Sequence, residues 1–230
     1  MFATIFTLIA AFALSMTSAG QTAATPTTQR FDYLVRADFF AGAAGDEARL
    51  QKATDLCERT LAENPKHPEA LVWHGAILLL RSGLAFQKGD QGNGMPLFGR
   101  GVKEMGDAVA LAPDNPGVRI PRGAVLIEAT KSMSPETARP LLELAVGDYE
   151  RALEIQAPTF STLGDHAKGE LLFGLAEASA RLGRQDKARA YFERVITDAP
   201  TSGQTPRAKE WIATGTLPKA SGMGCVGCHK

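Results

Sequence analysis

Residues 169–202 read GELLFGLAEASARLGRQDKARAYFERVITDAPTS, and this stretch decides how the rest of the chain is interpreted. In its first half, small and aliphatic side chains recur at spacings of three and four, which places them on one face of a helix. Gly183 is expected to end that helix, and Pro200 to end a second one in which charged and apolar residues alternate. Neither short helix can bury its apolar stripe alone, so the stretch predicts two helices packed against each other.

Eight positions of this stretch resemble the tetratricopeptide repeat, a helix pair of about 34 residues whose copies stack into a solenoid. The resemblance implies that neighbouring pairs cover each other's apolar faces and that the protein acts as an interaction scaffold. No catalytic triad, carboxylate pair or metalloprotease signature accompanies the repeat, so we expect no enzyme. The eight positions are Leu172, Leu175, Ala176, Gly183, Ala188, Phe192, Val195 and Pro200.

Similar helical periods recur upstream of residue 169. Residues 31–39 predict a first helix that ends at the loop AGAAGD, and a second helix follows and ends before Pro65. A third, over 69–84, is apolar nearly all round and is expected in the middle of the stack. The Gly-rich stretch 86–101 delays its partner, either as a loop or as lengthened helices.

Proline and cap residues set the limits of the later helices. Asn115 is a plausible N-cap, Pro121 is expected to delay the helix that follows it, and Ser134 precedes its partner helix. Thr205 opens a final helix that would cover the exposed apolar face of the last repeat. Residues 31–214 thus predict an all-α solenoid of about four stacked antiparallel helix pairs plus a capping helix.

The chain has 230 residues, of which 44% are apolar and 22% charged, and its formal net charge is zero. Such a composition is typical of a folded globular protein. A balanced charge gives no general reason to expect nucleic acid as a partner. A protein partner is instead what the resemblance to the tetratricopeptide repeat implies.

Residues 1–24 resemble a secretory signal peptide, because an uncharged apolar run is followed by small residues. The run is short for a membrane span, which needs about 20 apolar residues. We expect export, to a bacterial periplasm, and no integral membrane span once the leader is removed. Residues 25–30 are expected to form a linker.

Residues 215–230 form a Gly- and Ser-containing tail that ends in CVGCHK. Cys225, Cys228 and His229 match the C-x-x-C-H pattern of covalent c-type haem attachment. Two thiols at this spacing can add to the two vinyl groups on one porphyrin edge, while the next imidazole binds the iron. The tail therefore predicts haem c with His229 as an axial ligand, and an accessory role in electron transfer.

Three other interpretations of the same tail remain open. In an oxidising compartment Cys225 and Cys228 can form a disulfide, which would leave a non-haem interaction module. A zinc site would need a further ligand from elsewhere in the chain. A thiol-redox pair usually sits at a helix start on a βαβ fold, which this chain is not expected to have.

The second axial ligand of such a haem is not evident from the sequence. Because no domain follows the motif, we expect an exposed haem whose iron is five-coordinate or weakly six-coordinate. His74 lies in the apolar third helix and is expected to be a hydrogen-bonded core residue, and Cys57 a buried apolar one. The candidate ligands are His67, His74, His166, Met95, Met105, Met133 and Met223.

The resemblance also implies a partner surface. In the family's arrangement the first helix of each pair lines a concave face, which would receive a peptide of the partner. On that basis the residues expected to face the partner are Asp38, Glu69, Val72, Phe173, Glu177 and Arg181.

Overall fold

The computed structural model of the protein describes residues 30–218, which form nine α-helices, two short 3-10 helices and no strand. The expected signal peptide and haem-attachment motif lie outside these residues. The two 3-10 helices cover Thr130–Ser132 and Ala157–Thr162. The α-helices are α1 (Phe31–Ala43), α2 (Glu47–Glu63), α3 (Pro68–Gln87), α4 (Gln91–Leu111), α5 (Pro116–Ala129), α6 (Pro135–Gln156), α7 (Asp165–Arg181), α8 (Gln185–Asp198) and α9 (Thr205–Thr214).

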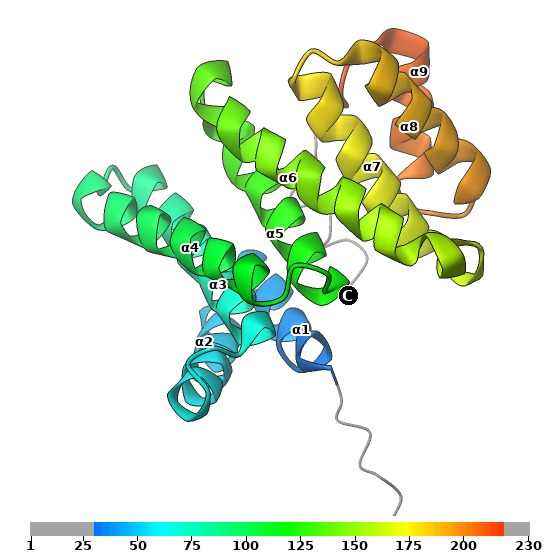
Figure 1. The fold of residues 1–230 in the computed structure, drawn as a ribbon. Helices are drawn as coiled ribbons and strands as arrows, with labels where there is room; N and C mark the ends of the chain where they lie inside the picture. The colour runs from blue at the N-terminus through cyan, green and yellow to red at the C-terminus, as the bar shows by residue number, and fades with distance from the viewer. Residues whose placement is uncertain (1–29, 219–230) are drawn as a thin grey trace, which may run out of the picture.

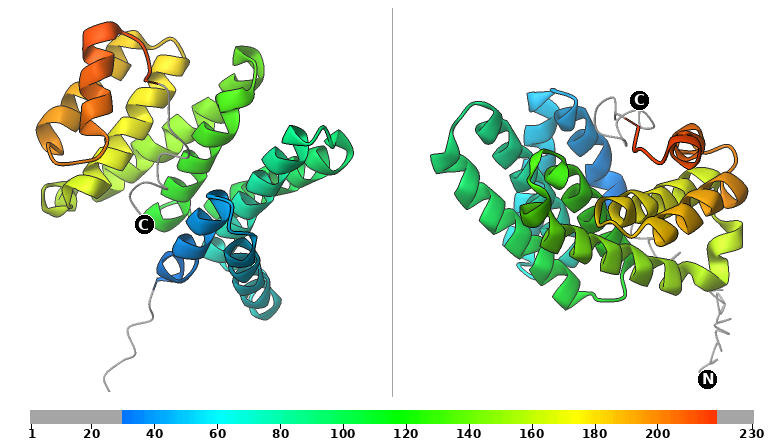
Figure 2. Two further views of the ribbon diagram at one scale, coloured as in Figure 1. Left: turned by 180° about the vertical axis from the view of Figure 1, so that it is seen from behind. Right: turned by 90° about the horizontal axis from the view of Figure 1, so that it is seen from above.

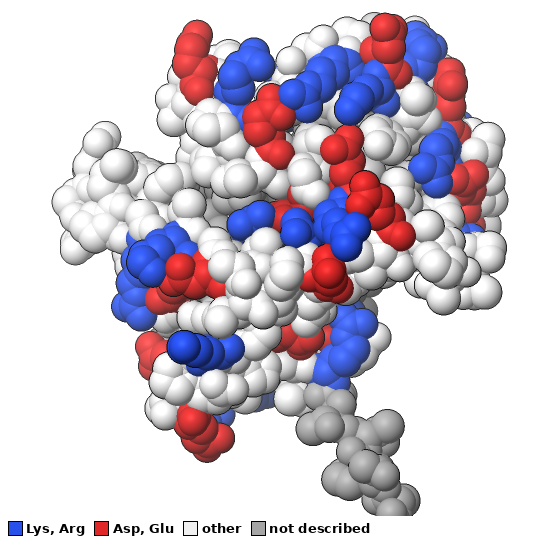
Figure 3. Space-filling view, viewed as in Figure 1, with Lys and Arg blue, Asp and Glu red and all other residues white. Residues whose placement is uncertain are grey.

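Consecutive helices pack as pairs, α1 with α2, α3 with α4, α5 with α6, and α7 with α8 (Figure 1). Contacts between α3 and α5 and between α6 and α7 join successive pairs, and α9 packs against α8 at the end of the stack. The predicted all-α solenoid of four pairs and a capping helix is thus confirmed. Figure 3 shows acidic and basic side chains interspersed over one face of it.

Short polar side chains begin several helices by accepting a backbone N–H that the helix leaves unpaired. The Asn115 side chain accepts from the Gly117 N–H at 2.8 Å, as the sequence predicts, and Ser134 accepts from Thr137 at 3.4 Å. Gly183 follows α7 with a φ of 78°, a conformation that favours glycine. The hairpin of residues 169–202 therefore has the predicted limits.

The Gly-rich stretch 86–101 is helical rather than a loop, apart from the turn between Gln87 and Gln91. The Ser82 hydroxyl donates to the Gly94 carbonyl at 2.8 Å, which ties α3 to α4. A Cβ on Gly101 would lie 2.2 Å from Leu79 Cδ1. Absent side chains thus allow the two helices to approach closely, and the extra residues lengthen both of them.

Pro121 does not delay its helix, contrary to the sequence prediction, because α5 already begins at Pro116 and continues through it. Pro96 in α4 and Pro140 in α6 lie inside their helices in the same way. Each of these prolines follows its N-cap residue by six positions, so its missing N–H removes a bond only to the second helical residue. The missing backbone hydrogen bond therefore lies in the first turns, where a helix tolerates proline best.

Helix α3 is buried on nearly every side, as the sequence predicts. By length and composition it is apolar enough to cross a membrane, although no membrane span was expected after the leader. However, 56% of its most apolar window is buried inside the fold. Contacts with the neighbouring helices α1, α2, α4 and α5 account for this composition.

A buried ion group joins the two helices of the third pair. Asp148 of α6 has no exposed surface and accepts hydrogen bonds from Arg119 at 2.8 Å and from Arg122 at 2.5 Å, both on α5. Leu144 of the same helix is 44% exposed. The buried face of α6 is thus built around Asp148 as well as around apolar side chains.

Candidate functional site: a groove along the first helices

Two neighbouring cavities lie along the first helices of the pairs. One, of about 360 Å³, is bounded mainly by α1, α5 and α7 with Trp73 of α3, and we call it the upper cavity. The other, of about 420 Å³, is bounded by α1, α3 and α5, and we call it the lower cavity. Both are lined by Phe39, Val125 and Glu128, so they are neighbours, and we call the two cavities together the first-helix groove. Figures 1 and 2 show the helices that surround it.

Three aromatic rings form the part of the groove where α1 meets α3. The Trp73 ring lies 5.2 Å from that of Phe39 and 6.3 Å from that of Phe40, both in edge-on arrangements. Trp73 is only 4% exposed, and its Nε1 has no hydrogen-bond partner among the described residues. A buried donor without a partner is uncommon.

The rim of the upper cavity carries charges of both signs. Tyr33 is 47% exposed, and the guanidinium groups of Arg30 and Arg36 lie 5.3 and 4.4 Å from its ring centre. Arg30 also pairs with Asp32 at 3.1 Å. Glu128 lines the opposite wall, on α5. The cavity can therefore receive an apolar group with charged groups at its edge.

His166 lines the upper cavity from the first turn of α7. Glu170, one helical turn further on, lines the same cavity and accepts a hydrogen bond from the Gln204 side chain at 2.7 Å. His166 is exposed, in contrast to His74. Among the histidines of the described residues, it is the one that combines exposure with a position in a cavity.

Four of the six residues expected to face a partner do not have the predicted position. Val72 has no exposed surface and Phe173 is 3% exposed, because both pack inside the apolar core. Asp38 is also buried, where it pairs with Arg49 and, at 3.1 Å, with Lys52 of α2. Glu177 is 8% exposed and lies 3.8 Å from Arg207.

The other two residues are partly exposed but act within the fold. Arg181 donates to the backbone carbonyls of Ile127 at 2.9 Å and Thr130 at 2.7 Å, and so ties α7 to the end of α5. Burial lowers the pKa of Arg181 from its usual value. Glu69 accepts from the Asp32 backbone N–H at 3.3 Å. None of the six lines the first-helix groove.

Apart from His166, a candidate haem ligand from the sequence, the residues that line the groove were not identified as site residues from the sequence. The buried residues of α1 that recur with the helical period include Phe31, Val35 and Phe39. Tyr33 and Phe40 lie beside this buried stripe. Of the two, Tyr33 is 47% exposed, whereas Phe40 is partly buried against the core, so the sequence offers at most a weak signal for the groove.

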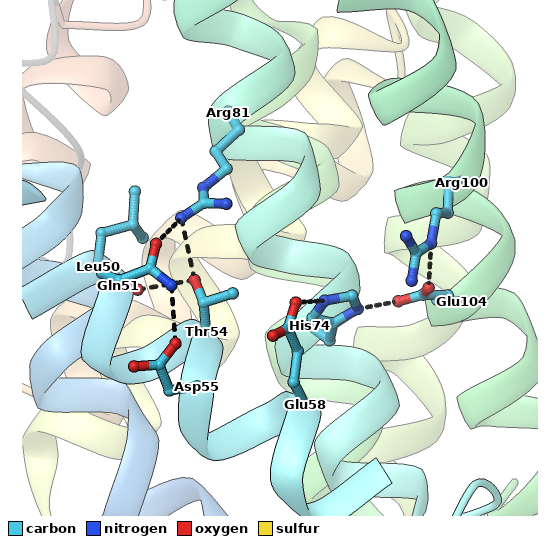
Figure 4. Close-up of polar contacts among 9 residues, drawn as sticks. All are labelled: Leu50, Gln51, Thr54, Asp55, Glu58, His74, Arg81, Arg100 and Glu104. Carbon is cyan, nitrogen blue, oxygen red and sulfur yellow. Dashed lines mark hydrogen bonds and ion pairs between the residues drawn. The ribbon is translucent and has the colours of Figure 1, made fainter. Parts of the chain in front are cut away.

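His74 is a buried structural residue, as predicted. Its Nδ1 lies 2.6 Å from Glu104 Oε2 on α4, and its Nε2 lies 3.9 Å from Glu58 on α2 (Figure 4). Burial, the largest influence on Glu104, raises the pKa of that carboxyl, but bonds and charges from His74 and Arg100 outweigh it, and the pKa lies below its ordinary value. The imidazole thus joins three helices.

Cys57 also has the predicted character. Its side chain has no exposed surface, and burial, together with the charges of Glu104 and Glu58, raises the pKa of the thiol to about 12. The thiol therefore stays protonated and unreactive in the folded protein. No group of three metal-binding side chains occurs within residues 30–218.

Residues 170–202 match the family model described as tetratricopeptide repeat. This range begins within α7 and includes the rest of α7, the turn after it and all of α8. No curated protein matches the sequence. The match covers one helix pair, so α7 and α8 are similar to a tetratricopeptide repeat, a type of repeat that generally mediates protein–protein interaction.

Proposed function

We propose that the protein is an exported scaffold that binds a protein partner in the first-helix groove and carries haem c on its C-terminal tail. The observation that carries the haem part is the C-x-x-C-H sequence at Cys225, Cys228 and His229. Its occurrence together with an apolar leader supports it, because both features belong to exported proteins. The groove supports the scaffold part.

Haem attachment would use both tail cysteines as thiols. Each S–H adds across one vinyl group of the haem, so that a C–S bond forms and the hydrogen goes to the neighbouring vinyl carbon. No oxidant or reductant is consumed in this addition. The bound haem would supply one-electron chemistry, and His229 would hold the iron from one side. The alternative, a Cys225–Cys228 disulfide, excludes attachment because it removes both thiols.

The groove offers a partner an apolar floor with charged residues around it. Its cavities have volumes within the usual range for binding sites, about 300 to 1,000 Å³. The aromatic residues Phe40 and Trp73 resemble the anchors that dominate interfaces, and Arg36 provides a charged edge. A peptide with an apolar anchor residue flanked by polar groups fits these features.

The haem proposal is tested by intact-mass analysis of the exported full-length protein, produced together with haem-attachment machinery. We expect a mass increase of one haem that survives denaturation. The double variant Cys225→Ala, Cys228→Ala should lack the increase, and Cys57→Ala should retain it. An unmodified wild-type protein, or a mass two hydrogens lower that indicates a disulfide, would replace the haem proposal with the non-haem scaffold.

A further inference from the structure

The N-terminal cap of α3 differs in kind from the other side-chain caps of the described helices. Helix α3 is capped by His67, whose Nδ1 accepts the Ala70 N–H at 3.1 Å. An imidazole nitrogen accepts a hydrogen bond only while it carries no proton, so this cap depends on the neutral ring. Helices α2, α4, α5 and α6 are capped by the acidic, amide or hydroxyl side chains that are usual at this position, namely Asp46, Asp90, Asn115 and Ser134.

His67 lies where the starts of α1 and α3 meet. The centre of its ring is 5.2 Å from that of the buried Phe31, in a tilted arrangement. The next residue of α1, Asp32, donates its backbone N–H to Glu69 Oε2 at 3.3 Å. The first turn of α3 therefore holds the start of α1 through an aromatic contact at His67 and a hydrogen bond at Glu69.

Glu69 connects the same junction to the start of α5. Its Oε1 accepts a hydrogen bond from the Asn115 side-chain amide at 3.3 Å. Asn115 in turn caps α5 by accepting the Gly117 N–H at 2.8 Å. Asp32 and Gly117 both line the upper cavity. The first turn of α3 is thus bonded to the ends of two cavity walls, α1 and α5.

We propose that His67 is a pH-sensitive cap that regulates the partner site: protonation of its ring releases the first turn of α3 and loosens the α1 and α5 walls of the upper cavity. The regulatory part of this inference rests on the proposed function, because it needs a partner in the groove. The change at the cap does not depend on it. Histidine side chains take up a proton near pH 6.5, so the change falls within the range of ordinary surroundings.

Protonation weakens the cap for two reasons. The Nδ1 that accepts the Ala70 N–H becomes a donor, so a backbone N–H at the start of the helix loses its partner. The ring also becomes positive at the N-terminal end of α3, where the helix dipole disfavours a cation. His67 is only partly buried, so a proton from the solvent can reach the ring.

The carboxylates of α3 and α1 near the cap already have other partners. Glu69, in the same turn as His67, binds α1 through one oxygen and α5 through the other. Asp32 of α1 pairs with Arg30 at 3.1 Å. No carboxylate of the described residues forms an ion pair with the His67 ring. A protonated ring that turned toward Glu69 would compete with the bonds to α1 and α5, and so would loosen the same junction.

The other charged groups around the cap do not compensate for a positive ring either. Asp114, which precedes α5, pairs with Arg151 at 2.8 Å. Lys66 directly precedes His67, and its positive charge opposes a second one. Glu63, the last residue of α2, is exposed, so water and salt weaken its attraction. Protonation of the cap therefore reduces the stability of the folded junction.

The first test measures urea unfolding of the full-length protein at about pH 7.5 and about pH 5.5, on either side of the usual titration of histidine. His67→Asn keeps a capping acceptor that does not titrate, so the folding equilibrium constant of the wild type should fall roughly fivefold relative to this variant at the lower pH. His67→Ala has no cap and should be less stable than His67→Asn by a similar factor at both pH values. Asp90→Asn makes a matched exchange at the cap of α4 and should follow the wild type, because aspartate titrates near pH 4.

The second test asks whether the cap acts on the cavity walls. Amide hydrogen exchange of residues 31–43, corrected for the pH dependence of the intrinsic rate, should be roughly fivefold faster in the wild type than in His67→Asn at the lower pH. Residues 185–198 of α8 should exchange equally in both proteins. Partners retained by the immobilised wild type should fall at the lower pH, and those retained by His67→Asn should not.

Three results would overturn the inference. They are an equal pH dependence of unfolding in the wild type and His67→Asn, a His67→Ala variant as stable as the wild type at the higher pH, and equal exchange of α1 in the wild type and His67→Asn. A protein that retains no partner at either pH would overturn the proposed scaffold function and the regulation with it, even where unfolding confirms the pH-sensitive cap.

Discussion

Gly75 of α3 and Gly101 of α4 lie so close that a Cβ added to either would come within 2.7 Å of the other's carbonyl oxygen. The contact brings the backbones of the second helix pair together, and Leu79 and Met105 close it on both sides. The longest pair of the stack, α3 with α4, thus depends on two residues that lack side chains. Within the stretch 86–101, Gly94 and Gly101 therefore contribute to helix packing.

Gly101→Ala should destabilise the protein by about 1–3 kcal/mol, because the new methyl group overlaps Leu79 and the Gly75 carbonyl. Gly99→Ala is the matched control in the same helix. Nothing lies within 4 Å of its added Cβ, so it should stabilise the protein by about 0.5–1 kcal/mol through helix propensity. Urea unfolding measures both changes, and equal effects of the two substitutions would contradict the close contact.

Asp148→Ala should reduce the free energy of unfolding by about 3–5 kcal/mol, because it leaves the guanidinium groups of Arg119 and Arg122 without their buried partner. Glu143→Ala removes an exposed partner of Arg184 from the same helix and should cost at most about 1 kcal/mol. Chemical denaturation of the two variants gives the comparison. A loss at Asp148 as small as that at Glu143 would show that the ion group is dispensable.

The Glu104 carboxyl should make the protein less stable in acid. Its folded pKa lies below its ordinary value of 4.5, so its contribution is present above that pH and is lost as the pH falls through the folded pKa. Glu104→Gln should flatten the decline in unfolding free energy below about pH 4.5. Glu58→Gln, at a 62% exposed side chain, should leave the decline unchanged. If the unfolding free energies of Glu104→Gln and of the wild type declined equally steeply below about pH 4.5, the pairing of Glu104 with His74 would not contribute to stability.

Cys57 should not react with iodoacetamide in the folded protein. Its pKa of about 12 keeps the thiol protonated, and its side chain has no access to solvent. The measurement uses the Cys225→Ala, Cys228→Ala variant, so that Cys57 is the remaining thiol. Labelling should begin only when denaturant unfolds the protein, and rapid native labelling would show that this part of the core opens.

The helices and their limits could be predicted from residues that act locally. Asn115, Ser134 and Gly183 define helix ends through their own hydrogen bonds or backbone preferences, and the structure places them as expected. Pro121 was misjudged because packing of α5 against α6 outweighs one missing hydrogen bond. Local signals are thus reliable only where tertiary packing does not oppose them.

The candidate site was much harder to predict. Val72 and Phe173 lie in stretches of α3 and α7 that are buried on nearly all sides, so the sequence period cannot show which side faces the groove and which the neighbouring pair. The groove itself forms where α1, α3, α5 and α7 meet, between residues far apart in the chain. Its position depends on how the pairs are stacked, which no local pattern in the sequence specifies.

Partner binding in the first-helix groove is tested most directly by substituting one exposed leucine in it. Leu84 of α3 lines the lower cavity and is 37% exposed, whereas Leu144 of α6 is 44% exposed and lines neither cavity. The wild-type protein and the variants Leu84→Glu and Leu144→Glu are each immobilised and exposed to the exported fraction of the source organism. Quantitative mass spectrometry then compares the proteins that each of them retains. We predict that partners retained by the wild type and by Leu144→Glu fall at least tenfold with Leu84→Glu, which corresponds to about 1.4 kcal/mol of binding free energy. Equal retention by all three proteins would contradict binding in the groove.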